Sequence, residues 1–123
     1  MKRSMMQVYV KNSNEAVLLY QKAFDAKLTA EYKNDDGTYM HAELDIEGQI
    51  VSLSEATNQT VGDNMQFCFH YGEGGKRNEA KIKKAYEILK VGGTVICPPE
   101  ECSFSPLMTC IIDKFGVNWG LFI

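Results

Sequence analysis

The chain has 123 residues, of which 45% are hydrophobic and 11% aromatic, and its formal net charge is −3. This length and apolar content predict one domain, or two tightly fused halves, and exclude an intrinsically disordered chain. The negative charge excludes a protein that binds polyanions through its overall composition, so we expect no nucleic-acid partner. The N-terminal MKRSMMQVYVK has only a short apolar run, which predicts neither a signal peptide nor a membrane span and favours a cytoplasmic location.

The first half of the chain predicts one strand, one helix and three further strands. The helix rests on an apolar stripe with the i, i+3, i+4, i+7 spacing of one helix face, and Asn12 or Ser13 is a plausible N-cap. The stripe consists of Ala16, Leu19, Tyr20 and Ala23. The expected elements span residues 5–11, 13–25, 27–34, 39–46 and 49–56, separated in part by turns at NDDG and EG.

The second half predicts the same order of elements. They span residues 64–71, 78–91, 94–98, 105–112 and 117–123. The helix stripe lies 66 positions after that of the first half and consists of Ile82, Ala85, Tyr86 and Leu89. The segments DIEGQIVSL and DKFGVNWGL share an Asp, a Gly three residues later and then a strand. Together these matches indicate an internal duplication, with modules at residues 1–60 and 61–123. The stretch GEGG at 72–75 lacks phosphate-loop spacing and is interpreted as a flexible connector.

Four of the predicted strands alternate between apolar and mostly polar side chains. Their apolar faces should cover the helices. These faces consist of Met6, Val8 and Val10; Met40, Ala42, Leu44 and Ile46; Met65, Phe67 and Phe69; and Val117, Trp119, Leu121 and Ile123. The opposite faces combine aromatic and uncharged polar side chains, which favours a semi-enclosed ligand pocket, although a solvated sheet face remains the alternative. The predicted ligand-binding residues are Gln7, Tyr9, Ser52, Gln66, Cys68, Asn118, Gly120 and Phe122.

This duplicated pattern resembles the vicinal-oxygen-chelate superfamily, which contains glyoxalase I, bleomycin-resistance proteins and extradiol dioxygenases. Within it the chain looks most like the PhnB-like branch. The resemblance covers nearly the whole chain and is carried by LYQKAFDAKL (19–28), HAELDIEG (41–48) and DKFGVNW (113–119). It implies an α+β fold in which two tandem βαβββ modules form a curved mixed sheet, or cup, with the helices outside. It also implies a homodimer, because related proteins often complete the cup across a two-fold interface.

Metal-using members of the superfamily supply two ligands from each module, usually His, Gln or Glu. By resemblance these positions fall on Met5, Ser52, Gln66 (or Met65, if the register slips) and Gly120. Met, Ser and Gly do not provide the donors that a divalent ion needs, so we expect no metal and no other cofactor. Gly120 then marks either a lost carboxylate, with space left for a ligand, or a position that avoids a packing clash.

Three residues on the expected cup face could still carry chemistry: His41, Glu43 and His70. They could form an acid–base set or a displaced metal site, although structural hydrogen bonding is the alternative. The four cysteines include a C-x4-C pair, Cys97 and Cys102, whose spacing does not match zinc sites, so free thiols are expected.

The sequence therefore predicts a protein that binds a small organic ligand in a metal-free cup. The alternative function is a metal-dependent lyase, isomerase or dioxygenase that uses a shifted site. A third possibility is an interaction protein that works through the basic second helix, although a solvated helix face is the usual meaning of such charges.

Overall fold

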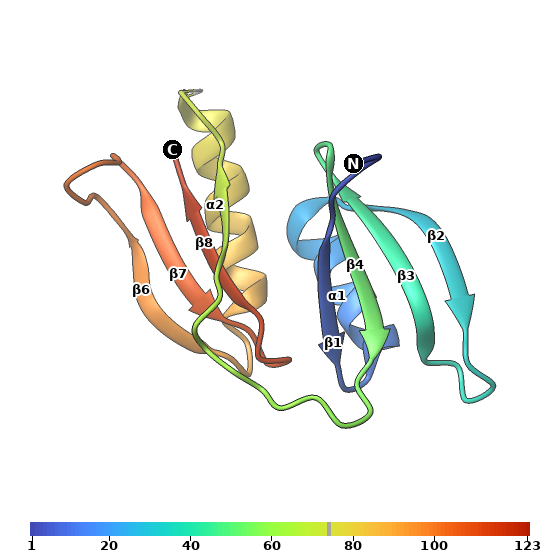
Figure 1. The fold of residues 1–123 in the computed structure, drawn as a ribbon. Helices are drawn as coiled ribbons and strands as arrows, with labels where there is room; N and C mark the ends of the chain where they lie inside the picture. Colours follow the sequence, from blue (N-terminus) through green and yellow to red (C-terminus); the bar gives the residue numbers. More distant parts are fainter. Residues whose placement is uncertain (74) are drawn as a thin grey trace. The chain divides into compact units, whose positions relative to one another are not determined.

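The computed structural model describes residues 1–73 and 75–123, which form two compact units, Met1–Thr60 and Val61–Ile123 (Figure 1). Each unit contains one helix and one four-stranded sheet. In the first unit the elements are β1 (Met6–Val10), α1 (Ser13–Phe24), β2 (Lys27–Lys33), β3 (Tyr39–Ile46) and β4 (Gln49–Glu55). In the second unit they are β5 (Phe67–His70), α2 (Gly75–Leu89), β6 (Thr94–Glu100), β7 (Met108–Ile112) and β8 (Asn118–Phe122).

The two sheets have the same topology. The strand orders are β1-β4-β3-β2 and β5-β8-β7-β6, and the first strand of each unit pairs in parallel with the last. The other strand pairs are antiparallel. The α+β fold with two tandem βαβββ modules is therefore confirmed, and the shared strand order supports the internal duplication.

The predicted helix stripes supply buried residues on the side of each helix that faces its sheet. Ala16, Tyr20 and Ala23 of α1 are buried, and α1 lies against β3 and β4 (Figure 1). In α2 the buried side chains include Ile82 and Leu89. The apolar strand faces meet these helices because side chains alternate along a strand, so one face of each sheet is apolar. The opposite face of each sheet, which is not covered by the helix, corresponds to the expected cup face. We call it the outer face of that sheet.

Two predicted inward-facing residues are exposed instead. Met40 has 60% of its surface exposed because the β2–β3 register shifts between Tyr32 and Lys33, and Tyr39 is buried in its place. Met65 is 73% exposed and precedes β5, which begins at Phe67. A one-residue irregularity reverses which side chain faces the core, and sequence alternation does not reveal it.

The second helix begins three residues earlier than predicted, at Gly75. Asn78, the expected first residue, lies in the first turn, and its side chain donates a hydrogen bond to the carbonyl oxygen of Tyr71 at 2.9 Å. Gly74, in the predicted connector, lies outside the described residues. Neither helix, over the residues described, is long and apolar enough to cross a membrane.

Candidate ligand-binding site

A buried carboxylate lies at the centre of the outer face of the first sheet. Glu43, on β3, is 8% exposed and receives two hydrogen bonds from the Arg3 guanidinium, at 2.9 Å to Oε2 and 2.7 Å to Oε1. The Nε2 atom of His41 lies 3.0 Å from the same Oε1 atom. Hydrogen bonds from Arg3, and then from His41, lower the pKa of Glu43 to about 2. Glu43 is therefore ionised near neutral pH and is a weak proton acceptor there.

The contact between His41 and Glu43 fixes the orientation of the imidazole. A neutral His41 that donates from Nε2 to the carboxylate has its lone pair on Nδ1, which can accept a proton from another molecule. The ring also lies beside Tyr32, with 6.3 Å between the two ring centroids. This arrangement suits a histidine that exchanges protons while the carboxylate holds it in place.

The predicted acid–base set is divided between the two units. His41 and Glu43 are in contact within the first unit. His70 belongs to the second unit, where its ring stacks on Phe122 with 4.7 Å between centroids and 7° between planes. Phe122 also packs against Phe104 in a T-shaped arrangement, with 5.7 Å between the ring centroids.

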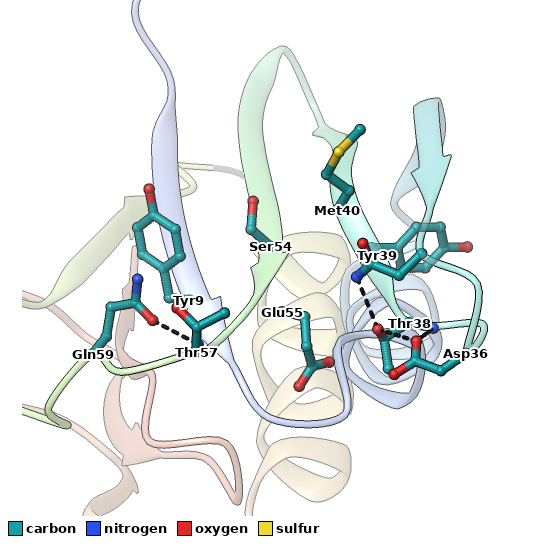
Figure 2. Close-up of a pocket in the computed structure, with 10 residues that line it drawn as sticks. Tyr9, Asp36, Thr38, Tyr39, Met40, Ser54, Glu55, Thr57 and Gln59 are labelled. Carbon is teal, nitrogen blue, oxygen red and sulfur yellow. Dashed lines mark hydrogen bonds between the residues drawn. The ribbon is translucent and has the colours of Figure 1, made fainter.

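A pocket opens in the first unit where β1 and β4 end and β3 begins (Figure 2). Its volume is about 580 Å³. The lining residues are Tyr9, Asn34, Asp36, Thr38, Tyr39, Met40, Ser54, Glu55, Thr57 and Gln59. Of the predicted ligand-binding residues, Tyr9 lines this pocket. Gln7 reaches its edge, because its amide donates a hydrogen bond to Ser54 Oγ at 3.1 Å.

One pocket residue also holds the start of α1. The Glu55 carboxylate accepts hydrogen bonds from the backbone nitrogens of Asn12, at 3.0 Å, and Ser13, at 2.8 Å. Asn12 has a left-handed conformation, with φ of 59°, and makes no side-chain cap. A carboxylate at this position satisfies free N–H groups and interacts favourably with the positive end of the helix dipole. Asn12 is thus the N-cap residue, as one of the two predicted alternatives, but the Glu55 carboxylate supplies the capping hydrogen bonds.

Loop residues complete the pocket wall. Asp36 accepts hydrogen bonds from the hydroxyl, at 2.6 Å, and the backbone nitrogen, at 2.9 Å, of Thr38. These bonds hold the pKa of Asp36 below its usual value, and the hydroxyl bond has the larger effect. Gln59 accepts a hydrogen bond from the backbone nitrogen of Thr57 at 2.9 Å. Strand alternation could not identify these residues; the turn sequence NDDGT was the available signal for the Asp36 loop.

The positions that the resemblance assigns to metal ligands make contacts within their own units. Ser52 Oγ donates a hydrogen bond to Met5 Sδ at 2.8 Å. Gln66 donates from its amide to Asn118 Oδ1 at 3.1 Å and accepts from Cys68 Sγ at 3.2 Å. A thioether, a hydroxyl and an amide do not form the donor set that a divalent ion needs, so these positions do not fit the metal of the superfamily. Throughout residues 1–73 and 75–123, no three His, Cys, Asp or Glu side chains are grouped to hold a metal ion.

The space above Gly120 is filled by a neighbouring side chain. A Cβ atom at this position would lie 2.8 Å from Gln66 Oε1 and 3.3 Å from Cys68 Sγ. Gly120 is buried on the outer face of the second sheet, opposite Cys68 and Cys110 on the flanking strands. The structure therefore favours the second interpretation of Gly120, that glycine avoids a packing clash.

Substitutions at Gly120 should separate a small steric effect from a larger electrostatic one. Gly120→Ala should lower the free energy of unfolding by less than about 1 kcal/mol, because the exposed end of the Gln66 side chain can move away. Gly120→Glu should cost about 2–3 kcal/mol, because it adds a carboxylate beside the Gln66 amide oxygen in a buried place. We expect neither variant to gain tight metal binding. Melting temperatures with and without Ni²⁺ or Zn²⁺ test this, and a Gly120→Glu protein as stable as the parent would contradict it.

The chain resembles several known proteins. It is 27% identical over 116 residues to the uncharacterised protein Mb0911c of Mycobacterium bovis, a match that covers 91% of this chain and 76% of that protein. No family model matches the chain. The PhnB protein from Bacillus cereus has a similar structure, with a TM-score of 0.80, 22% identity, and coverage of 99% of this chain and 98% of that one.

A fosfomycin resistance protein, FosX from Listeria monocytogenes, is also similar in structure. Its TM-score is 0.72 at 13% identity, over 98% of this chain and 90% of that one. That structure contains Mn(II) and 1S,2S-dihydroxypropylphosphonic acid. These neighbours confirm the fold that the resemblance to the vicinal-oxygen-chelate superfamily implies, and they include the PhnB-like proteins. Some proteins with this fold therefore bind a metal.

Proposed function

We propose that this protein binds a small organic molecule in the pocket of the first unit. The observation that carries the proposal is the position of Tyr9, which is 50% exposed and lines a pocket of about 580 Å³. Figure 2 shows Tyr9 and Met40 on two sides of the pocket, with Ser54 and Glu55 between them. Ligand sites in proteins commonly combine such apolar surface with a few polar groups that fix orientation.

The charges of the pocket indicate the class of ligand. Among its described lining residues the charged ones are Asp36 and Glu55, both carboxylates. An anionic ligand would be repelled, whereas a neutral or amine-bearing molecule would not. An apolar part of the ligand would contact Tyr9 and Met40, and its hydrogen-bonding groups would meet Ser54, Thr57 or Gln59. This preference differs from the anionic phosphonic acid bound in the FosX structure.

Two exposed tyrosines of the first unit allow a matched test. Ligand-detected NMR would screen a library of small neutral and amine-bearing aromatic compounds against the parent protein. We expect Tyr9→Ala to weaken binding of the hits at least about tenfold, because it removes the aromatic wall of the pocket. Tyr32→Ala removes a tyrosine that is 58% exposed but lies outside the pocket, so it should leave affinity unchanged.

The two variants also distinguish the alternatives. Hits that bind equally well to Tyr9→Ala would contradict the proposal. Hits lost only in Tyr32→Ala would place the ligand beside His41, because Tyr32 lies next to that ring. A library without any hit would also count against a pocket of this chemistry.

The contact between His41 and Glu43 favours a second candidate function, proton-transfer catalysis on the outer face of the first sheet. The metal-dependent form of this alternative is less well supported, because both oxygens of Glu43 already accept hydrogen bonds from Arg3. We expect the purified protein to contain less than about one equivalent of Ni, Zn, Fe or Mn in elemental analysis. Stoichiometric metal that is lost in His41→Ala or Glu43→Gln would instead support a metal-dependent enzyme.

A further inference from the structure

Two cysteines face each other across neighbouring strands of the second unit. Cys97 on β6 is the register partner of Cys110 on β7, so the two side chains lie on the same face of the sheet. Cys97 is half-buried, and Cys110 is 7% exposed. Cys97 and Cys102 form the C-x4-C pair in the sequence. In the structure, however, Cys102 contacts Met108, with 3.9 Å between the two sulfur atoms.

We propose that Cys97 and Cys110 form a reversible disulfide by exchange with a low-molecular-weight disulfide such as glutathione disulfide. Directly opposed residues of antiparallel strands have Cα atoms roughly 4.5–5.5 Å apart, which lies within the range that disulfides span. The β6–β7 register is irregular on both sides of Cys97, so the edge strand can adjust by the small amount that bond formation requires.

The reaction consists of two exchanges. The thiolate of one cysteine attacks a sulfur of glutathione disulfide, forms a mixed disulfide and releases one glutathione thiolate. The thiolate of the second cysteine then attacks the protein sulfur of the mixed disulfide and releases the second glutathione. Two protein thiols are oxidised, one glutathione disulfide is reduced to two glutathione molecules, and the two protons from the cysteines pass to the released thiolates.

The surroundings of the pair make this exchange slow and its product durable. Burial, and then the neighbouring Cys110 thiol, raise the pKa of Cys97 to about 11, so this thiol is protonated at neutral pH. Little of the Cys97 thiolate is then available to attack. The same high pKa makes the Cys97 thiolate a poor leaving group, so a reductant breaks the finished bond slowly.

The bond would fasten an edge strand to its neighbour. β6 is at the edge of the second sheet and carries two exposed apolar side chains, Val95 and Ile96. An edge strand with exposed apolar residues is a site where chains can pair and aggregate when it separates from the sheet. A link between Cys97 and Cys110 would hold this strand in place under oxidising conditions.

Mass spectrometry of the oxidised protein tests the proposal. The reduced full-length protein is equilibrated in mixtures of oxidised and reduced glutathione at pH 8, and its free thiols are then alkylated. We expect a monomer that has lost about 2 Da and two alkylation sites, with one peptide pair linking Cys97 to Cys110. Cys97→Ser should abolish this species, whereas Cys68→Ser and Cys102→Ser should retain it. The oxidised monomer should melt roughly 10 °C higher than the reduced one.

Three results would overturn the proposal. They are a link between Cys97 and Cys102, oxidation confined to a glutathione adduct on the exposed Cys68, and disulfides only between molecules. Cys97→Ser is the informative variant because its side chain is half-buried, and its melting temperature in reductant shows whether it is folded. The double variant Cys68→Ser/Cys102→Ser lacks both competing thiols, and it should still form the link between Cys97 and Cys110.

Discussion

Asp113→Ala is expected to lower the free energy of unfolding by about 3–4 kcal/mol, the largest single loss we predict. The Asp113 side chain is 3% exposed and accepts hydrogen bonds from the backbone nitrogens of Phe115, at 2.9 Å, and Val117, at 3.1 Å. Its second oxygen accepts a bond from Trp119 Nε1 at 2.9 Å. The alanine variant would remove these bonds and leave buried N–H groups without the carboxylate, because Trp119 is fully buried.

The duplicated sequence supplies the control for this prediction. Asp45 occupies the equivalent position of the first unit, before the same turn, and it accepts a bond from the backbone nitrogen of Gly48 at 2.6 Å. The Asp45 side chain is half-exposed, so water can replace its carboxylate as the hydrogen-bond acceptor. Asp45→Ala should therefore lower the free energy of unfolding by about 1 kcal/mol. Urea unfolding followed by the fluorescence of the single tryptophan reports on the second unit, and circular dichroism reports on both. Equal losses in the two variants would show that the Trp119 bond contributes little.

Local patterns in the sequence were sufficient to predict the helices and strands and their repetition in the two modules. The helix stripes at Ala16 and Ile82 depend on spacing within one helix, and strand alternation depends on a period of two. The repeated Asp and Gly at the last turn of each module predicted two similar turns. They did not predict that Asp113 also binds an indole, because that contact depends on how β8 packs.

The features that sequence reasoning missed are contacts between distant residues. Arg3 precedes the first strand and reaches Glu43, 40 positions away, and Glu55 caps a helix that begins 42 positions before it. The pairing of Cys97 with Cys110 depends on an irregular strand register. Each of these contacts follows from strand order and register, which periodicity alone does not specify. Of the pocket, the sequence pattern predicted Tyr9, whereas half of the lining residues lie in loops, where strand alternation gives no information.

Removal of Arg3 should change how stability depends on pH. The pKa of Glu43 is about 2 in the folded protein and about 4.5 in an unfolded chain. The ionised carboxylate therefore stabilises the fold fully above about pH 4.5, and this contribution is lost as the pH falls from 4.5 toward 2. In Arg3→Ala the largest cause of the lowered pKa disappears, so the folded value should rise and the slope of stability across this range should decrease.

The size of the effect at neutral pH is moderate because Arg3 is partly in water. Its side chain is 52% exposed, so solvent screens the interaction, and we expect only a moderate loss of stability in Arg3→Ala at pH 7. Lys2→Ala is the matched control, since it removes the same charge from the adjacent exposed residue. Urea unfolding at pH 7, 4 and 2.5 measures the slope, and NMR titration of the Glu43 carboxyl carbon measures its pKa. If Arg3→Ala and Lys2→Ala give the same slope as the parent, the guanidinium does not hold this carboxylate in solution, and Glu43 would be free to act as an acid–base group beside His41.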